Sequence, residues 1–443
     1  MKYRYIWLLL PLIFCGCSAT TTKVKQEEPH PFFSPKKIQA PLVSINIIDR
    51  NGLTETVSSK DRLDNYKNVN FLSHQPYTKV LRVFAKDKEG TATSQITSYH
   101  PNGQVKQYLE VENGRAHGSY AEWHANGKMK LSAFVIQGIP DIDERSELTW
   151  LFDGTSRAWD EEGRLLTAIF YKKGELADTS RYFHPDGSVA KEIPYVNGEM
   201  HGAVKCFYPG GALAEITHFA AGVLAGDSET YWPDTRLACK EFYEKGLLKQ
   251  GAYYTKNGEL VASIAEGTGK RCVFDENGPR EFHEWKNGKA EGEVVILTSN
   301  NFVITRYFIK NNEKHGSELR YYPPPPFTKT GEGQPQPKLV IEWYEGKIHG
   351  LVKTWYDNGI QESQREMSNN LKQGIFTAWY RDGSLMFIEE YEKDKLVRGE
   401  YSKKDTGTPI SKVEKGKGEA YVYDGDGNFC KKIRYTDGKP IEG

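Results

Sequence analysis

The sequence predicts an all-β protein in which tandem β-hairpin repeats of about 24 residues form an extended, curved, single-layer antiparallel sheet. First, one pattern occurs twice, as YVNGEMHGAVKCFYPGG at 195–211 and as WYEGKIHGLVKTWYDNG at 343–359. Second, Asn-Gly and Asp-Gly pairs, which favour hairpin turns, recur along the chain. Third, 26 Tyr, 20 Phe and 9 Trp with 42 Gly and 21 Pro suit short strands and tight turns.

The first seventeen residues have the pattern of a signal peptide. They begin with Lys2 and Arg4, continue with an apolar stretch from Ile6 to Phe14, and end in small residues around two cysteines. The apolar stretch is too short to span a bilayer comfortably.

The stretch Phe14-Cys15-Gly16-Cys17 resembles a bacterial lipobox, in which a small residue precedes the cysteine that is lipidated after cleavage. Gly16 fits that place if Cys17 is the lipidated cysteine. Lipidation of Cys15 would instead place the bulky Phe14 at the cleavage site. We therefore expect residues 1–17 to be a lipoprotein signal and Cys17 to be lipidated. Secretory cleavage near Ala19 is the alternative. A serine after the lipidated cysteine, as at Ser18, implies outer-membrane delivery in Gram-negative lipoproteins.

Two segments precede the repeats. Residues 18–43 are polar and contain prolines, and they are predicted to be a flexible tether between the membrane and the folded body. Residues 44–93 alternate apolar and polar residues but match the repeat only loosely, so we expect an N-terminal cap.

Residues 94–443 form the predicted array, of about fourteen units. We number each unit from the glycine of the His-Gly pair or its equivalent. The unit starts are Gly118, Gly154, Gly202, Gly226, Gly251, Gly267, Gly292, Gly316, Gly350, Gly374, Gly399 and Gly418, with Ser94 and Asp178 in the same place in two further units.

Three features recur in the unit. The sixth residue is usually aromatic, the tenth is usually a glycine after Asn, Asp or Glu, and the eighteenth is again aromatic, followed three residues later by another glycine. Two turns per unit leave two segments of about seven residues, long enough for strands and too short for ordinary helices. We expect the aromatic residue at position eighteen to lie across from the opening glycine of the next unit. Strict alternation puts positions six and eighteen on opposite faces, and one bulge per unit would bring them together.

The array resembles the MORN repeat in its bacterial variant form, found in proteins labelled YwqK-type antitoxins, with the signature Y-x-x-G-x-x-x-G-x-x-x-x-Y-x-x-N-G. Stretches such as GLVKTWYDNG at 350–359 and GIFTAWYRDGS at 374–384 match it, whereas the unit at Gly251 is short and that at Gly267 has a shifted turn. The resemblance implies stacked hairpins in a long curved sheet.

Two units carry insertions. The unit at Gly118 has its excess around IPDIDERSE (139–147), and the unit at Gly316 has its excess around PPPPFTKTGEGQPQP (323–337). The second insertion replaces an Asn-Gly turn and is expected to protrude from that edge of the sheet.

No catalytic site, cofactor site or metal site is predicted. Cys206, Cys239, Cys272 and Cys430 are expected several strands apart, so no disulfide is expected. No Cys-x-x-Cys or His-Glu-x-x-His spacing occurs, and GTGKR (267–271) lacks a full phosphate-binding loop. With 59 Lys+Arg against 59 Asp+Glu and no basic run, nucleic acid is not an expected partner.

The aromatic residues at position six are either packing within the sheet or part of an open groove for a peptide, glycan or protein. The candidates are Trp123, Trp159, Trp355 and Trp379. We therefore expect a non-enzymatic, lipid-anchored repeat protein of the cell envelope, at the outer membrane, that acts as a protein-binding scaffold. An antitoxin that neutralises a partner toxin is the alternative. An enzyme is disfavoured because no stretch outside the repeats is long enough for a catalytic domain.

Overall fold

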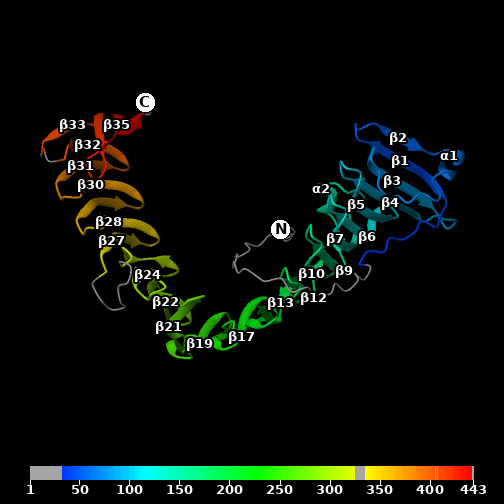
Figure 1. Ribbon diagram of the computed structural model, residues 1–443, viewed down its shortest axis with the longest axis horizontal. Coiled ribbons are helices and arrows are strands. Elements are labelled where there is room, and N and C mark those ends of the chain that lie inside the picture. The colour runs from blue at the N-terminus through cyan, green and yellow to red at the C-terminus, as the bar shows by residue number, and fades with distance from the viewer. Residues whose placement is uncertain (1–31, 325–334, 405, 407, 442–443) are drawn as a thin grey trace.

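The computed structural model describes residues 32–324, 335–404, 406 and 408–441. Within these residues the chain forms one 36-stranded antiparallel sheet and two short helices, α1 (Lys60–Asp64) and α2 (Glu144–Glu147). The sheet follows an open arc, from β1 and α1 at one tip, through β17 to β21, to β33 and β35 at the other tip (Figure 1). The predicted fold class is confirmed. Neither helix in the described part of the chain is long and apolar enough to cross a membrane.

The N-terminal tip is a small sheet with a helix packed on it. Strand β1 (Leu42–Asp49) pairs with β2 (Thr54–Val57) on one side and with β3 (Thr78–Lys86) on the other, and β3 pairs with the first strand of the array. Leu63 of α1 joins a buried cluster with Ile45, Val57 and Val83. This segment closes the end of the array, as a cap does.

The array continues as consecutive hairpins. Its strands are β4 (Ala92–Tyr99), β5 (Val105–Glu112), β6 (Arg115–Trp123), β7 (Met129–Gln137), β8 (Leu151–Phe152), β9 (Gly154–Trp159), β10 (Leu165–Lys172), β11 (Glu175–Leu176), β12 (Asp178–Phe183), β13 (Val189–Val196), β14 (Glu199–Met200), β15 (Gly202–Phe207), β16 (Leu213–Ala220), β17 (Val223–Tyr231), β18 (Leu237–Glu244), β19 (Leu247–Tyr254), β20 (Leu260–Ala265), β21 (Thr268–Asp275), β22 (Gly278–Lys286), β23 (Lys289–Leu297), β24 (Val303–Lys310), β25 (Glu313–Lys314), β26 (Gly316–Tyr321), β27 (Pro337–Tyr344), β28 (Lys347–Trp355), β29 (Gln361–Ser368), β30 (Leu371–Trp379), β31 (Leu385–Glu392), β32 (Lys395–Ser402), β33 (Pro409–Glu414), β34 (Lys417–Tyr423), β35 (Phe429–Thr436) and β36 (Lys439–Ile441).

The aromatic residue at position eighteen lies across from the glycine of its own unit, so the expectation that it faces the next unit is wrong. Gly202 pairs with Phe219, and Gly226 pairs with Tyr243. The cause is a bulge at the second turn: Thr217 pairs with Ser228 but Phe219 pairs with Leu224, so His218 alone faces three residues. Because of this bulge, Phe219 pairs with Leu224 and not with Gly226, the opening glycine of the next unit.

A carboxylate fills several of these bulges and explains the glycine. At Gly350, whose φ is +108°, the Leu351 N–H donates to Glu342 Oε2 over 2.8 Å. A Cβ atom on Gly350 would lie 2.1 Å from that oxygen, so no other residue fits without displacing the carboxylate. Glu110 and Glu284 accept equivalent bonds from Ser119 and Glu293.

The two faces of the sheet differ. Residues at positions three, sixteen and eighteen form the core face, where Ile96, Leu109, Val111 and Val135 are buried together. Residues at positions two, four, six, fifteen and seventeen lie on the opposite face, which we call the strap face for the segment bound to it. Position-six Tyr99 accordingly packs with the cap. Positions six and eighteen therefore lie on opposite faces.

The first insertion covers the core face near the N-terminal tip. It forms α2, which Asp143 caps by accepting hydrogen bonds from two backbone N–H groups. Trp150 packs on Tyr120 with ring centroids 4.7 Å apart, and Asp141 pairs with Arg82 over 2.8 Å. It thus supplies the second layer that a single sheet lacks. In the second insertion, the Tyr322 N–H bonds the Gln336 carbonyl, and the predicted protruding loop at 325–334 lies outside the described residues.

Candidate binding surface

A ladder of hydrogen bonds at the first turns holds successive hairpins together. The side chain at position seven of one unit donates to the backbone carbonyl at position six of the next. Tyr322 reaches the Trp355 carbonyl over 2.8 Å, and Tyr356 reaches that of Trp379 over 2.8 Å. His100 does the same to Trp123 over 2.8 Å.

This ladder fixes the backbone of the predicted tryptophans, and the sequence interpretation missed it. The signal was present, because His or Tyr repeatedly follows the position-six aromatic residue, as in YHPNG, FHPDG and WYDNG. Strand alternation alone would place this side chain at an exposed edge of the sheet. In the structure it donates a hydrogen bond to a backbone carbonyl that would otherwise face water.

Two of the four candidate tryptophans are covered by the chain itself. Phe33 lies 5.2 Å from Trp123 between ring centroids, in an edge-to-face arrangement, and Phe32 lies 5.5 Å from Trp159. Phe33 also meets Tyr108 edge to face at 5.3 Å. Aromatic pairs of this geometry stabilise a contact by about 1 kcal/mol beyond the area they bury.

We call residues 32–37 the strap, because they cross the strap face from β9 to β4. Polar contacts hold its backbone: the Phe32 carbonyl accepts from Ser132 Oγ at 2.6 Å, the Lys36 N–H donates to Glu110 Oε1 at 2.7 Å, and the Lys36 carbonyl accepts from Gln95 Nε2 at 2.5 Å. The Arg157 guanidinium lies 4.6 Å above the Phe32 ring. The described part of the predicted tether therefore contacts the sheet, and β1 begins within that range, at Leu42.

The other two candidates, Trp355 and Trp379, are half-buried on neighbouring hairpins of the strap face. Among the described residues, no other aromatic ring stacks on either indole. Ile375 and Ile388, at positions two and fifteen beside them, are 41% and 40% exposed. The four tryptophans thus form two pairs, at β6 and β9 and at β28 and β30, in different parts of the arc (Figure 1).

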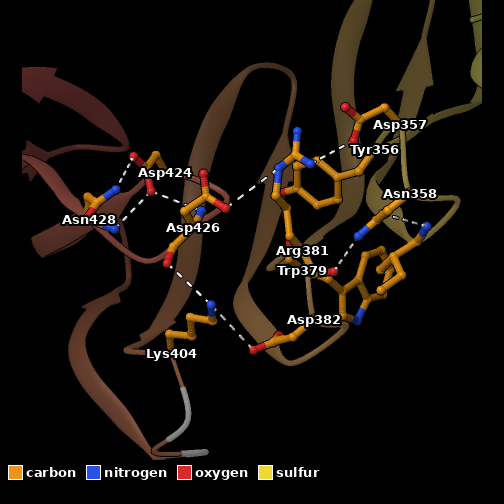
Figure 2. A network of polar contacts seen from close by, with 11 residues as sticks. Tyr356, Asp357, Asn358, Trp379, Arg381, Asp382, Lys404, Asp424, Asp426 and Asn428 are labelled. Atoms are coloured by element: carbon orange, nitrogen blue, oxygen red, sulfur yellow. Dashed lines mark hydrogen bonds and ion pairs between the residues drawn. The ribbon is translucent and has the colours of Figure 1, made fainter.

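A polar cluster joins several turns near the C-terminal tip. Figure 2 shows Arg381 lying over the Tyr356 ring, 5.0 Å from its centroid, and directed toward Asp357 and Asp426. The guanidinium is 2.7 Å from Asp357 and 3.7 Å from Asp426. The Arg381 N–H also donates to the Gly425 carbonyl. Turns of three units are therefore coupled, which stiffens this end of the array.

Two buried glutamates of the core face show opposite protonation tendencies. Burial opposes ionisation of Glu241, but Arg271, 2.7 Å away, and hydroxyl donors outweigh it and lower its pKa. Burial raises the pKa of Glu389, and the hydroxyls of Tyr401 and Tyr391 offset this only in part. Both carboxylates are enclosed by their own sheet and serve the packing of the core face.

The described residues contain no group of three or more His, Cys, Asp or Glu placed to hold a metal ion. The four cysteines in the described part of the chain are free thiols, and burial raises the pKa of three of them, Cys206, Cys239 and Cys272. Thiols with raised pKa are weak nucleophiles. The candidate binding surface is the strap face with its paired tryptophans.

Comparison with known proteins supports the repeat assignment. The family model for the MORN repeat variant matches residues 179–197, which span β12, its turn and β13. No curated protein matches the chain. Among solved structures, a mutant form of the Photorhabdus luminescens Tc holotoxin pore is similar over 88% of this chain and 23% of that chain, at 9% identity and a TM-score of 0.14. So low a score carries no argument about fold or function.

The matched segment is one hairpin, and the next two hairpins repeat its register and its irregularity at the first turn. Hairpin repeats of this kind stack into scaffolds with an extended surface. The chain is a tandem β-hairpin protein that carries the MORN repeat variant.

Proposed function

We propose that the protein is a non-enzymatic scaffold, anchored in the cell envelope by a lipid on Cys17, which binds a protein partner on its strap face. The observation that carries this proposal is the strap, an extended segment held on that face by ring contacts and by hydrogen bonds to its backbone. A surface that binds one extended segment in this way has the chemistry to bind another.

Exposed apolar side chains on the strap face support a binding role. Ile375, Phe242 and Ile388 are each about two-fifths exposed. Ile375 and Ile388 lie on the paired strands β30 and β31, and exposed apolar surface is typical of interaction sites where it is contiguous, whereas Phe242 lies apart from them on β18. The sheet is a long open arc in which successive hairpins lie side by side (Figure 1).

The anchor is tested by membrane fractionation. The parent chain is expected in the outer-membrane fraction and a Cys17→Ala variant in the soluble fraction. If the variant fractionates with the membrane as the parent does, lipidation at Cys17 is not what holds the protein there.

The binding role is tested by capture from membrane extract with residues 18–443, which include every described residue. A double variant, Trp355→Ala with Trp379→Ala and with its fold checked by circular dichroism, is compared with Leu53→Ala, an exposed residue of the cap. We expect a partner that the parent and Leu53→Ala retain and the double variant loses. A hydrolytic or transferase activity in this material would contradict the scaffold, and protection of cells from a toxic neighbouring gene product would favour the antitoxin alternative.

A further inference from the structure

A second stretch of the strap face, along β26–β30, repeats the strand register of the stretch that holds the strap. We call these two stretches the second groove and the strap groove. The strap crosses five successive strands, β4, β5, β6, β7 and β9, and strands β26–β30 pair in the same register even though both stretches carry insertions. Thr97↔Tyr108 corresponds to Leu319↔Val340. Ala121↔Ser132 corresponds to Lys353↔Gln364, and Ser132↔Arg157 corresponds to Gln364↔Thr377.

The strap-binding positions are therefore placed alike in the two grooves. Trp123 and Trp159 correspond to Trp355 and Trp379. Glu110 corresponds to Glu342, and one oxygen of each accepts a hydrogen bond from the bulge of the next strand at 2.8 Å.

The second oxygen of Glu110 accepts the Lys36 N–H of the strap. The second oxygen of Glu342 has no hydrogen-bond donor among the described residues. The groove along β26–β30 thus presents the same acceptor and the same pair of indoles, and no described segment lies across them.

Five positions differ between the grooves. Ser317 replaces Gln95 and Gln364 replaces Ser132, the two side chains of the strap groove that donate to carbonyls of the strap. Val340 replaces Tyr108, Thr377 replaces Arg157, and Lys353 replaces Ala121, which is fully buried in the strap groove. Lys353 adds a long cationic side chain at the centre, and no ion pair to it is present in the described part of the chain. The second groove is therefore less suited to the strap itself.

We propose that this second groove, formed by Ser317, Val340, Glu342, Trp355, Gln364 and Trp379, binds an extended segment of a partner protein that carries two consecutive aromatic residues. This proposal rests on the scaffold function and names its recognition chemistry. The two aromatic side chains contact Trp379 and Trp355, as Phe32 and Phe33 contact Trp159 and Trp123. A backbone N–H three residues farther on donates to Glu342.

The occupant is a partner and not a strap. Within one chain, the strap is tethered beside its own groove at an effective concentration in the millimolar range, which disfavours exchange. A strap from a second copy would also give up the Tyr108 and Arg157 contacts of its own groove.

The test uses a fluorescent peptide with the sequence of residues 29–40, PHPFFSPKKIQA, as the probe. Its binding to residues 18–443 is followed by fluorescence anisotropy. We expect saturable binding that Trp379→Ala weakens about tenfold or more, since a central indole is a typical hot spot. A peptide with both phenylalanines changed to alanine is expected not to bind.

A second variant guards against misfolding of the tryptophan mutant. Lys353→Ala copies the alanine of the strap groove and removes a half-buried charge that has no ion pair among the described residues, so it should fold and should bind the probe about threefold or more tightly. Leu53→Ala is the matched control and should bind as the parent does.

Hydrogen exchange identifies the groove that is used. Protection on β27–β30 supports the proposal. Protection on β5–β9 means that the peptide displaced the strap, and that result overturns the proposal, as does the absence of saturable binding at millimolar peptide. Dimerisation that depends on Phe32 and Phe33 would show that a second copy is the occupant and would also overturn it. If the peptide fails but capture still depends on Trp355 and Trp379, the scaffold function stands and only the strap-like recognition fails.

Discussion

At the scale of single residues, Glu241 and Glu389 form a natural comparison within one chain. Both lie at position sixteen and accept hydrogen bonds from two tyrosine hydroxyls. They differ because Arg271 lies beside Glu241, whereas the equivalent position beside Glu389 is the buried Ala420. Glu241 has an ion-paired guanidinium, whereas Glu389 has no ion pair among the described residues and is affected by the charge of Lys372 less than by its own burial; this difference explains the opposite pKa directions.

Replacing each glutamate with glutamine is expected to change stability with opposite dependence on pH. Because the pKa of Glu389 is raised in the folded state, its ionisation costs stability as pH rises through that pKa. Glu389→Gln should therefore gain stability relative to the parent, on the order of 1 kcal/mol, as pH rises from the ordinary glutamate pKa of about 4 through the raised pKa of Glu389. Hydrogen exchange of β31 and β32 across that range measures the effect.

Glu241→Gln serves as the comparison. The lowered pKa of Glu241 means that its carboxylate stabilises the fold above the unfolded pKa and that this contribution is lost as pH falls. At neutral pH the variant should lose about 2 kcal/mol, since Arg271 is left with a neutral partner. The same pH trend in both variants would contradict this account.

The bulge glycines give a second prediction at this scale. Gly350→Ala should lower the free energy of unfolding by about 2 to 3 kcal/mol, because it combines a positive φ with a clash against Glu342. Gly154→Ala is the control, since its φ is +80° but no atom lies within 4 Å of the added Cβ. Its loss should be about 1 kcal/mol. If urea denaturation shows equal losses of unfolding free energy for Gly350→Ala and Gly154→Ala, the clash with the Glu342 carboxylate is not the cause.

At the scale of elements, the strap behaves as an extra layer on the first hairpins. Phe33→Ala should expose Trp123, shift tryptophan emission to the red and speed proteolysis near residues 32–40. The expected loss is about 2 to 3 kcal/mol of local stability, from a half-buried ring and two edge-to-face contacts. Tyr77→Ala, at a residue that is 82% exposed, should leave emission and proteolysis unchanged. An unchanged spectrum in Phe33→Ala would mean that the strap does not stay seated in solution.

At the scale of the whole molecule, each strand pairs with its neighbours in sequence, so stability is expected to be local. A chain that ends at residue 324 lacks β27–β36 but keeps β1–β26, including the first insertion and the strands on both sides of it. Hydrogen exchange of β3–β7 should match that of the parent, while β24 and β26 should exchange faster because a new edge is exposed. A loss of protection throughout the array would show that the sheet unfolds as one cooperative unit.

The sequence by itself determined the hairpin, its repeat length and the class of sheet, because turn residues and short strands are local properties that a periodic pattern records. Asn-Gly turns and the glycine at position one are readable wherever the chain repeats them. The bulge was not readable in the same way: the pairing of Gly202 with Phe219 depends on how many residues the opposite strand presents, and that count is set between strands.

Tertiary structure alone decided which of the four tryptophans the strap covers. Trp123, Trp159, Trp355 and Trp379 occupy one position of the unit and are alike in sequence. Only the folded chain distinguishes the pair under Phe32 and Phe33 from the pair at β28 and β30. The strap lies about a hundred residues from the side chains that it covers, as in the bond between Ser132 and Phe32. Contacts at that separation leave no periodic trace in the sequence, and they are the contacts from which the binding surface is proposed.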